Sequence, residues 1–544
     1  MADLIRAIEC ANANTTSDKI ILGSNIVLPT ANNETLGSNG LPAITSNITL
    51  EGANFTLTRN TGYSCDGSDP SFRLFFVTQT GNLTLNNLTL KNGCALGGVN
   101  AAWGGAISMA EGATINLSQV ALLDNSASIG GAIFVPFRGS LLANNITAQN
   151  NNALNQGGAI HGDYGSTINV ANSVLSNNSS TNLGGAVSNF GIGMFTHSTF
   201  DNNTTGSYGG GIYNNGLAKI TLLNSTVSNN SSGYFGGGLV YDGSGTIDDS
   251  TFVNNSSPRG GGVLVYDGTL TIANSTFSGN SAENYGGGIG NRNGDLTLRH
   301  VTITGNSSPT GAGVSSKSNA DTTLTILDSS IVAGNDTTTD SGEDVQITGD
   351  GSTNTFQSNG YNVIGTVGTT AVIDGTDDIT GVVDPLLNTL SDNGCETQHA
   401  TTSGLACVQT HGLEWASLAI DLATGSTEAT DQRGSKRPQQ GSPDAGAHEA
   451  WWLDITAVNA NNGELSWQDA ISNCTYDVFE STTPYFTHST SAAYLNASTA
   501  HPINGRLGDP TTNYFFINRA TCTGDVTIDS NEVGEFDFTI VPGT

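Results

Sequence analysis

The sequence predicts an all-β protein, a parallel β-helix that begins with a capping helix and is followed by a separate β-sandwich. A glycine motif returns about every 26 residues, with short runs of alternating apolar residues between its copies. Glycine accounts for 70 of the 544 residues, and only 12% of the chain is charged, which argues against a helix-rich fold. A repeat of this length fits three short strands and three turns, with successive coils about 4.8 Å apart.

Residues 1–16 are the expected N-terminal cap. Leu4, Ile5, Ile8 and Ala11 fall on one side of a helix and can cover the first coil. A solenoid needs such a cap because an open β end pairs with another molecule. End-to-end or lateral self-association is therefore an alternative that we keep open.

Residues 17–95 contain irregular coils, with an insertion around Cys65. The seven cysteines show neither CxxC nor zinc-ligand spacing, which favours disulfides over a metal site. Disulfides are typical of proteins outside the cytoplasm, and no apolar run approaches the roughly 20 residues that span a membrane. We therefore expect a processed chain outside the cytoplasm. Cys10 is left without a partner. The expected pairs are Cys65 with Cys94, Cys395 with Cys407, and Cys474 with Cys522.

The glycine motif has a Gly pair, a small residue and an aliphatic residue, with Ala312 replacing the second Gly of the last copy. We expect glycine here because it adopts positive φ freely and allows close backbone approach at a tight corner, while the aliphatic residue returns to the interior. The aliphatic residues of the nine copies are Ile107, Ile133, Ile160, Val187, Ile212, Leu239, Val263, Ile289 and Val314.

Two polar columns accompany this motif. In the first, an asparagine follows an apolar residue by three positions, and we expect its amide to bond to the same amide in neighbouring coils and to tolerate the left-handed conformation. The second lies six positions earlier, and we interpret both as structural. The first column contains Asn125, Asn151 (a weak copy), Asn178, Asn203, Asn230, Asn255, Asn280 and Asn306. The second contains Gln119, Asn145, Asn172, His197, Asn224, Asp249, Asn274 and His300.

Less regular coils and a loop-rich stretch complete the β-helix, which we expect to span residues 17–450. From residue 451 to residue 544 glycine becomes rare, and aromatic residues recur at intervals typical of a β-sandwich. The strands around Trp467, residues 476–479 and residues 532–536 resemble a fibronectin type III module. This resemblance implies a domain that spaces or docks.

The paired motifs over about residues 100–335 resemble the repeat of chlamydial polymorphic outer membrane proteins. More broadly, they are similar to secreted bacterial β-helix proteins of the pectate-lyase-like superfamily. Residues 4–12 are similar to the opening helix of this group, and residues 431–449 resemble its closing motif. The resemblance implies a right-handed parallel β-helix, a bacterial source, and secretion or display at the cell surface.

The net charge of the chain limits the classes of partner that it can bind. The formal net charge is −31, from 16 Lys and Arg against 47 Asp and Glu, which excludes nucleic acid as a partner. Only seven basic residues lie between residues 90 and 320, which argues against polyanionic substrates. Neither a calcium-binding nonapeptide repeat nor an EF-hand loop occurs, so we expect no cofactor and no metal site, with loose Ca²⁺ binding as the alternative.

One band of residues after the glycine motif is the candidate site. Asp242 and Asp267 follow the motif at nearly equal offsets in adjacent coils, so we expect them to lie close together. Aromatic rings beside carboxylates suit sugar binding, whereas Asp-Gly is also ordinary turn chemistry and a tyrosine at a corner can shield the coil edge. The candidate ligand-binding residues are His161, Asp163, Tyr164, Tyr213, Tyr241, Asp242, Tyr266, Asp267 and Arg292.

Two functions remain. The first is a non-catalytic role in adhesion, with an extracellular glycan or a neighbouring cell surface as the partner. The alternative is a polysaccharide-active enzyme, a glycoside hydrolase or lyase with a shallow groove along the β-helix face. In that case Asp242 and Asp267 are the candidate catalytic residues, because a hydrolase needs two carboxyl groups roughly 5 to 10 Å apart.

Overall fold

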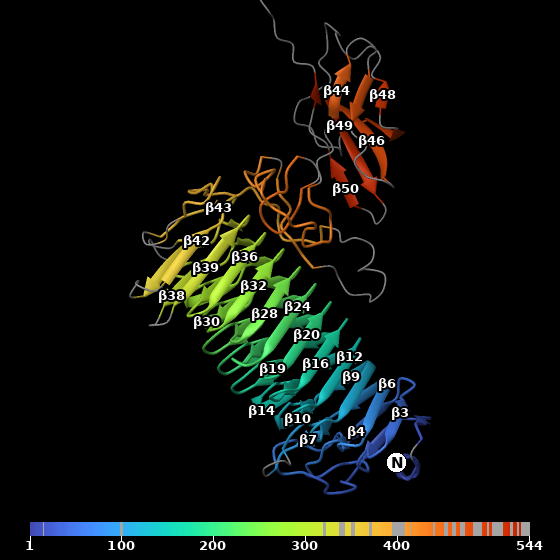
Figure 1. Ribbon diagram of the computed structural model, residues 1–544. Coiled ribbons are helices and arrows are strands. Elements are labelled where there is room, and N and C mark those ends of the chain that lie inside the picture. Colours follow the sequence, from blue (N-terminus) through green and yellow to red (C-terminus); the bar gives the residue numbers. More distant parts are fainter. Residues whose placement is uncertain are drawn as a thin grey trace, which may run out of the picture.

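The computed structural model confirms a nearly all-β chain built on a parallel β-helix, with one helix at the N-terminus (Figure 1). The strands stack in rows along a rod (Figure 1). The structure describes residues 1–14, 16–97, 102–318, 322–336, 343–349, 354–368, 371, 373–393, 408–414, 416–438 and 441–450, and the strands between 455 and 534 mainly by their backbone.

Each regular coil adds strands to three parallel sheets, named A, B and C in chain order. Sheet A has 24 strands, β1 Asp18–Ile21, β2 Ile26–Leu28, β3 Asn47–Glu51, β4 Thr56–Arg59, β6 Asn82–Lys91, β9 Thr114–Leu123, β12 Ser140–Asn144, β13 Thr147–Gln149, β16 Thr167–Ala171, β17 Val174–Ser176, β20 Ile192–Thr196, β21 Thr199–Asp201, β24 Lys219–Leu223, β25 Thr226–Ser228, β28 Ser244–Asp248, β29 Thr251–Val253, β32 Thr269–Ala273, β33 Thr276–Ser278, β36 Asp295–Arg299, β37 Thr302–Thr304, β39 Thr323–Asp328, β40 Ile331–Val332, β42 Asn354–Ser358 and β43 Val363–Ile364. Sheet B has 8 strands, β7 Cys94–Ala95, β10 Ser126–Ile129, β14 Asn152–Gln156, β18 Ser179–Ser180, β22 Thr204–Thr205, β26 Ser231–Ser232, β30 Ser256–Arg259 and β34 Ser281–Tyr285. Sheet C has 11 strands, β5 Phe75–Val77, β8 Ile107–Met109, β11 Ile133–Val135, β15 Ile160–Gly162, β19 Val187–Asn189, β23 Ile212–Asn214, β27 Leu239–Tyr241, β31 Val263–Val265, β35 Ile289–Asn291, β38 Val314–Ser318 and β41 Val345–Gly349.

The N-terminal cap is the helix α1 (Ala2–Asn12). Leu4, Ile8 and Ala11 are buried against the first coils, as their spacing predicts. The Asn12 side chain fixes the end of the helix, because its Nδ2 donates to the Ala43 carbonyl at 2.7 Å. The cap therefore closes the apolar interior at this end.

The first asparagine column is buried, and its amides bond from coil to coil as predicted. Asn178 Nδ2 donates to Asn203 Oδ1 at 3.0 Å and to the Ala148 carbonyl at 2.9 Å. The positive φ belongs to the residue before each asparagine, for example 54° at Asn177, which corrects our expectation for the column itself. The amide bonds link Asn125, Asn151, Asn178, Asn203, Asn230, Asn255, Asn280, Asn306 and Asn335.

The second polar column forms the bend of sheet A. Its eight predicted members all have positive φ, between 42° and 55°, so each coil carries four short strand segments where we expected three. The following residue supplies the bonds between coils in most of them. Ser198 Oγ accepts the N–H of Ser173 at 3.2 Å and donates to the Thr196 carbonyl at 2.9 Å. A serine column is therefore part of the corner.

The two glycines of the repeated motif have different roles. Gly209 has φ of +70°, the left-handed conformation that glycine adopts at little cost. A Cβ at Gly210 would lie 2.2 Å from the carbonyl oxygen of Gly237 in the next coil. The following Ile212 is fully buried, as expected. The motif thus supplies a sharp turn, a close backbone approach and a core side chain.

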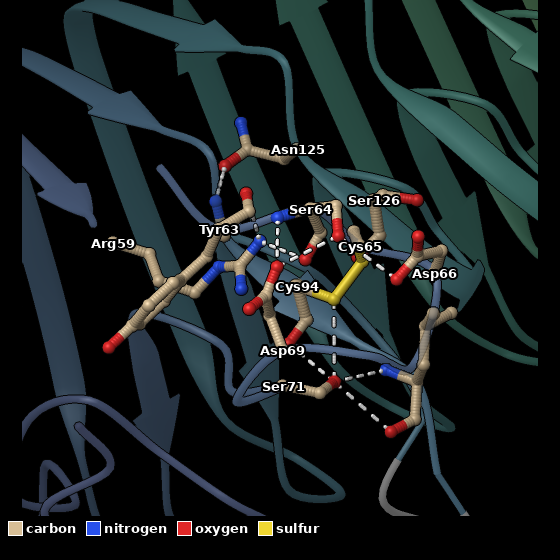
Figure 2. The surroundings of a disulfide bond; sticks show 12 residues. Arg59, Tyr63, Ser64, Cys65, Asp66, Asp69, Ser71, Cys94, Asn125 and Ser126 are labelled. Atoms are coloured by element: carbon tan, nitrogen blue, oxygen red, sulfur yellow. Dashed lines mark hydrogen bonds between the residues drawn. A yellow bond between two sulfur atoms is a disulfide. The ribbon is translucent and has the colours of Figure 1, made fainter. Parts of the chain in front are cut away.

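The insertion near the start is held by the predicted Cys65–Cys94 disulfide (Figure 2). Arg59 is fully buried beneath this loop and donates to the carbonyls of Asn92 and Pro70, both at 2.8 Å. Among the described cysteines, Cys10 is free and exposed. Cys395 and Cys407 lie outside the described residues.

Residues 408–450, which we call the closing segment, fold back over the outer face of sheet A. Thr276 Oγ1, on β33, donates to Gln432 Oε1 at 2.6 Å. The segment is held internally by the buried ion pair of Arg437 with Glu449, whose atoms are 2.9 Å apart. The closing segment therefore covers part of the outer face of sheet A.

The C-terminal strands pair antiparallel in two sheets. The backbone register places Cys474 opposite Cys522. The disulfide between them and the fibronectin type III likeness remain predictions. The first sheet contains β44 Ile455–Asn459, β45 Glu464–Trp467 and β48 Ala500–Pro502, and the second contains β46 Cys474–Ser481, β47 Ala492–Ala497, β49 Phe515–Cys522, β50 Val526–Asp529 and β51 Val533–Gly534.

Candidate functional site

The outer face of sheet C differs from coil to coil, unlike the interior. The residue after each buried aliphatic points outward, because side chains alternate along a strand. In register, this position holds Phe134, His161, Ser188, Tyr213 and Val240 in successive coils. The candidate site therefore lies on a variable surface over an invariant core.

A buried apolar cluster supports this surface. Phe235, Val240, Leu264 and Tyr285 pack together outside the main core, where sheets B and C meet. Phe235 and Tyr285 stand directly before glycine pairs, and their rings fold over the outward side chains of sheet C. The surface therefore has a rigid base, which a binding site needs.

Aromatic rings run along this face in an unbroken series that we call the aromatic track. Neighbouring ring centroids lie between 4.5 and 6.5 Å apart, within the range of favourable ring contacts. Two further contacts add exposed rings to it: Tyr164 lies edge-on to Phe190 at 5.2 Å, and Tyr234 lies edge-on to Tyr208 at 5.7 Å. The track contains Trp103, Phe134, His161, Phe190, Tyr213, Tyr208, Phe235 and Tyr266.

Three tyrosines present ring surface to solvent. The exposed fractions are 46% for Tyr164, 43% for Tyr234 and 36% for Tyr266. Tyr213 is half-buried, and burial is the main cause that raises the pKa of its hydroxyl. The structure thus brings Tyr164, Tyr213 and Tyr266 of the predicted set onto one face.

Two predicted residues lie beneath this face. His161 is buried, its Nδ1 is 2.6 Å from Ser188 Oγ, and burial lowers its pKa to about 3. Tyr241 is fully buried in the core, where its hydroxyl donates to the Thr269 carbonyl at 2.7 Å. Both side chains support the face from below, and only the exposed rings of the aromatic track are available for contact.

Asp242 and Asp267 lie close together, as their offsets predict, and line one open hollow of about 380 Å³. Burial, followed by the charge of Asp267, raises the pKa of Asp242. The remaining residues of this acidic hollow are Gly216, Leu217, Ala218, Gly243, Ser244 and Gly268.

The other predicted residues border these features. Asp163 accepts a hydrogen bond from the N–H of Tyr164 at 2.8 Å, which fixes the turn below that ring. The guanidinium carbon of Arg292 lies 4.7 Å from the ring centroid of Tyr266 and 5.3 Å from that of Phe235. Arg292 therefore belongs to the same face as the aromatic track.

Among the described residues, no group of three or more His, Cys, Asp and Glu side chains is arranged to hold a metal ion. Two neighbouring carboxylates alone are too few for the six to eight oxygen ligands that Ca²⁺ takes. The geometry instead offers apolar rings for stacking, with carboxylates beside them as hydrogen-bond acceptors.

Sequence reasoning missed several residues of this face. Trp103, Tyr208, Phe235 and Tyr285 share one position, directly before the glycine pair. An aromatic residue occupies this position in four of the nine copies, and this recurrence is a signal that the sequence itself contains.

Comparison with known families gives one short match. Residues 197–215 match the Chlamydia polymorphic membrane protein repeat. This stretch joins Phe200 and Asn203 to the glycine motif that ends at Ile212, which is the pairing on which the predicted resemblance rests. The chain is thus a β-helix protein with a repeat of this type.

No curated protein matches the chain. Among solved structures, the A-module of the mannuronan C-5 epimerase AlgE6 from Azotobacter vinelandii aligns with 13% identity and a TM-score of 0.23. The alignment covers 70% of this chain and 93% of that chain. A structural likeness with this TM-score does not indicate an activity for this chain.

In the part of the chain that the structure describes, no helical segment has the length and apolar character of a membrane span.

Proposed function

We propose that this chain is a surface-displayed or secreted β-helix protein that binds glycans without turning them over, through the aromatic track and the acidic hollow. The observation that carries the proposal is the row of exposed tyrosines Tyr164, Tyr234 and Tyr266 on one rigid face. Sugar rings stack on such surfaces, and neighbouring carboxylates accept their hydroxyl hydrogens. The Chlamydia-type repeat supports display at a bacterial surface.

The face also has the dimensions of a chain-binding surface. The aromatic track crosses coils from Trp103 to Tyr266, and adjacent coils of a parallel β-helix lie about 4.8 Å apart. A glycan lying along the rod would therefore meet several rings and the acidic hollow together. Weak single contacts add up on such an extended surface, which suits adhesion.

The second candidate is a glycoside hydrolase that uses Asp242 and Asp267. It is favoured by the shared hollow and by the raised pKa of Asp242, the direction that a general acid needs. In that reaction one carboxyl group would protonate the leaving oxygen, and the other would attack the sugar carbon or activate a water.

A glycan array and a reducing-sugar assay on the same preparation separate these functions. We expect binding to one glycan class with no release of reducing ends. Release that Asp242→Asn abolishes would replace adhesion by hydrolysis. Binding to no glycan would refute the proposal.

A further inference from the structure

Three basic side chains from successive coils gather at the C-terminal end of the aromatic track. Arg292 lies over Tyr266 and Phe235. The guanidinium carbon of Arg259 lies 5.4 Å from the same Phe235 centroid. The ring of Phe235 therefore joins two guanidinium groups that are 33 residues apart in the sequence.

The other contacts of this group are of the same kind. Arg259 lies 4.6 Å from the ring centroid of Tyr234. Lys317 Nζ, on β38, lies 5.0 Å from that of Tyr285. Cation–π contacts hold the charged ends over the rings and leave their N–H groups available to a ligand. We call Arg259, Arg292 and Lys317 the cation group.

Among the residues that the structure describes, no carboxylate lies at salt-bridge distance from the cation group. Within the residues that the structure describes, the ion pairs shorter than 4.0 Å involve other basic residues of the rod, such as Arg299 with Glu428. In a chain with a net charge of −31, three neighbouring basic side chains without a described carboxylate at salt-bridge distance are an unusual arrangement. Like charges at one site repel each other, so an anionic ligand would relieve this repulsion.

We propose that the cation group binds an acidic sugar residue of the glycan, whose neutral part stacks along the aromatic track. The inference rests on the proposed glycan binding and adds the class of ligand. A planar guanidinium matches a carboxylate or sulfate with two parallel hydrogen bonds, which favours the two arginines as its direct contacts.

The overall charge limits how acidic the glycan is. The net charge of −31 and the hollow formed by Asp242 and Asp267 repel a chain that carries a negative group on every residue. A mostly neutral glycan with an isolated acidic residue places its charge on the cation group alone. Only seven basic residues lie between residues 90 and 320, which argues against a polyanionic ligand. The same small number is consistent with a glycan that carries a single acidic sugar.

The test uses the full chain on an array of matched glycan pairs that differ by one acidic sugar, either a uronic acid, a sialic acid or a sulfated hexose. We expect the acidic member of at least one pair to bind about tenfold more tightly than its neutral partner, because a charge-assisted hydrogen bond is stronger than a neutral one. The preference should weaken as the salt concentration rises.

Variants identify the residues. Arg292→Gln and Arg259→Gln should each reduce the preference and Arg292→Lys should keep part of it, while Lys219→Gln, which removes an exposed charge from β24, should leave it intact. Thermal unfolding of each variant checks that the fold is retained. Equal binding of acidic and neutral members, or a preference that the double arginine variant keeps, would overturn the inference and leave glycan binding in place. Binding to neither member of any pair would refute glycan binding itself.

Discussion

The buried asparagine column and the aromatic track run through the same coils, yet they differ in how strictly each position repeats. Asparagine stands at every coil of the column, because each amide must meet the next one in register. On the outer face of sheet C, the corresponding position changes from Phe134 to His161 to Ser188. Strict repetition therefore marks positions that build the rod, and variation marks the surface that is free to acquire a function.

The glycine pair should show the largest effect on the structural side of this comparison. Gly210→Ala would place a Cβ against the carbonyl of the next coil, and we expect it to lower the free energy of unfolding by about 3 kcal/mol or more. Gly211→Ala is the matched control, because Ala186 occupies the same register position one coil earlier. Chemical denaturation measures both. A similar loss for the two variants would contradict the assigned roles.

The amide column comes next. Asn151→Ala removes the side-chain bonds to Asn178 and to the Leu122 carbonyl, and it takes the acceptor from the buried backbone N–H of Asn125. We expect a loss of about 2 to 3 kcal/mol in the free energy of unfolding.

The neighbouring exposed Asn152 offers the control, since Asn152→Ala should cost less than about 1 kcal/mol. Glycan binding by the folded fraction of both variants should equal that of the parent chain. If Asn151→Ala abolished binding without unfolding the rod, the column would have a functional role.

The interface between the rod and the closing segment should depend on pH. Burial, followed by the charges of Asp248, Asp431 and Glu428, raises the pKa of Asp249 to about 8. An unfolded aspartate titrates near pH 3.9, so the folded chain keeps a proton that the unfolded chain loses. This contribution to stability is complete below about pH 4 and disappears as the pH rises through 8.

Asp249→Asn tests this dependence. The variant carries the uncharged amide that Asn224 and Asn274 supply at the same corner in neighbouring coils. We expect a higher Tm than the parent at pH 8 and nearly the same Tm at pH 4. If the difference in Tm between variant and parent is the same at both pH values, Asp249 does not contribute to the pH dependence of stability.

Substitutions in the exposed aromatic track should have the smallest effect on stability and a clear effect on glycan binding. Tyr266→Ala should weaken glycan binding about 3- to 10-fold and change the free energy of unfolding by less than about 1 kcal/mol. Ile21→Ala removes an exposed apolar side chain from β1, near the cap, and should leave the affinity unchanged. Equal affinities of Tyr266→Ala and the parent would place the glycan elsewhere.

The fold could be predicted from the sequence because its strict requirements repeat. Positive φ, close backbone approach and amide stacking each require a particular residue type at a fixed spacing. The glycine pairs and the buried asparagines lie in the register that this spacing predicts. The assignment of left-handed φ to the column asparagines failed because the residue before each of them makes the turn, as Asn177 does.

The candidate site was harder to predict. Offsets from the glycine motif placed Asp242 beside Asp267, but they could not show that Tyr241 points inward while Tyr266 points outward. The shared ring contact of Arg259 and Arg292 depends on side-chain directions across coils, which spacing does not encode. The closing segment likewise covers sheet A through contacts between residues more than 100 positions apart, such as Thr276 with Gln432.

Amide hydrogen exchange of the whole chain, with and without a glycan selected on the array, tests the central claim most directly. The account predicts slower exchange on binding at residues 234–236, 266–268 and 292–294, where the rings, the acidic hollow and the cation group lie. Exchange in β25, β29 and β33 of sheet A should not change. Protection confined to the closing segment or to sheet A, with none on the outer face of sheet C, would contradict it.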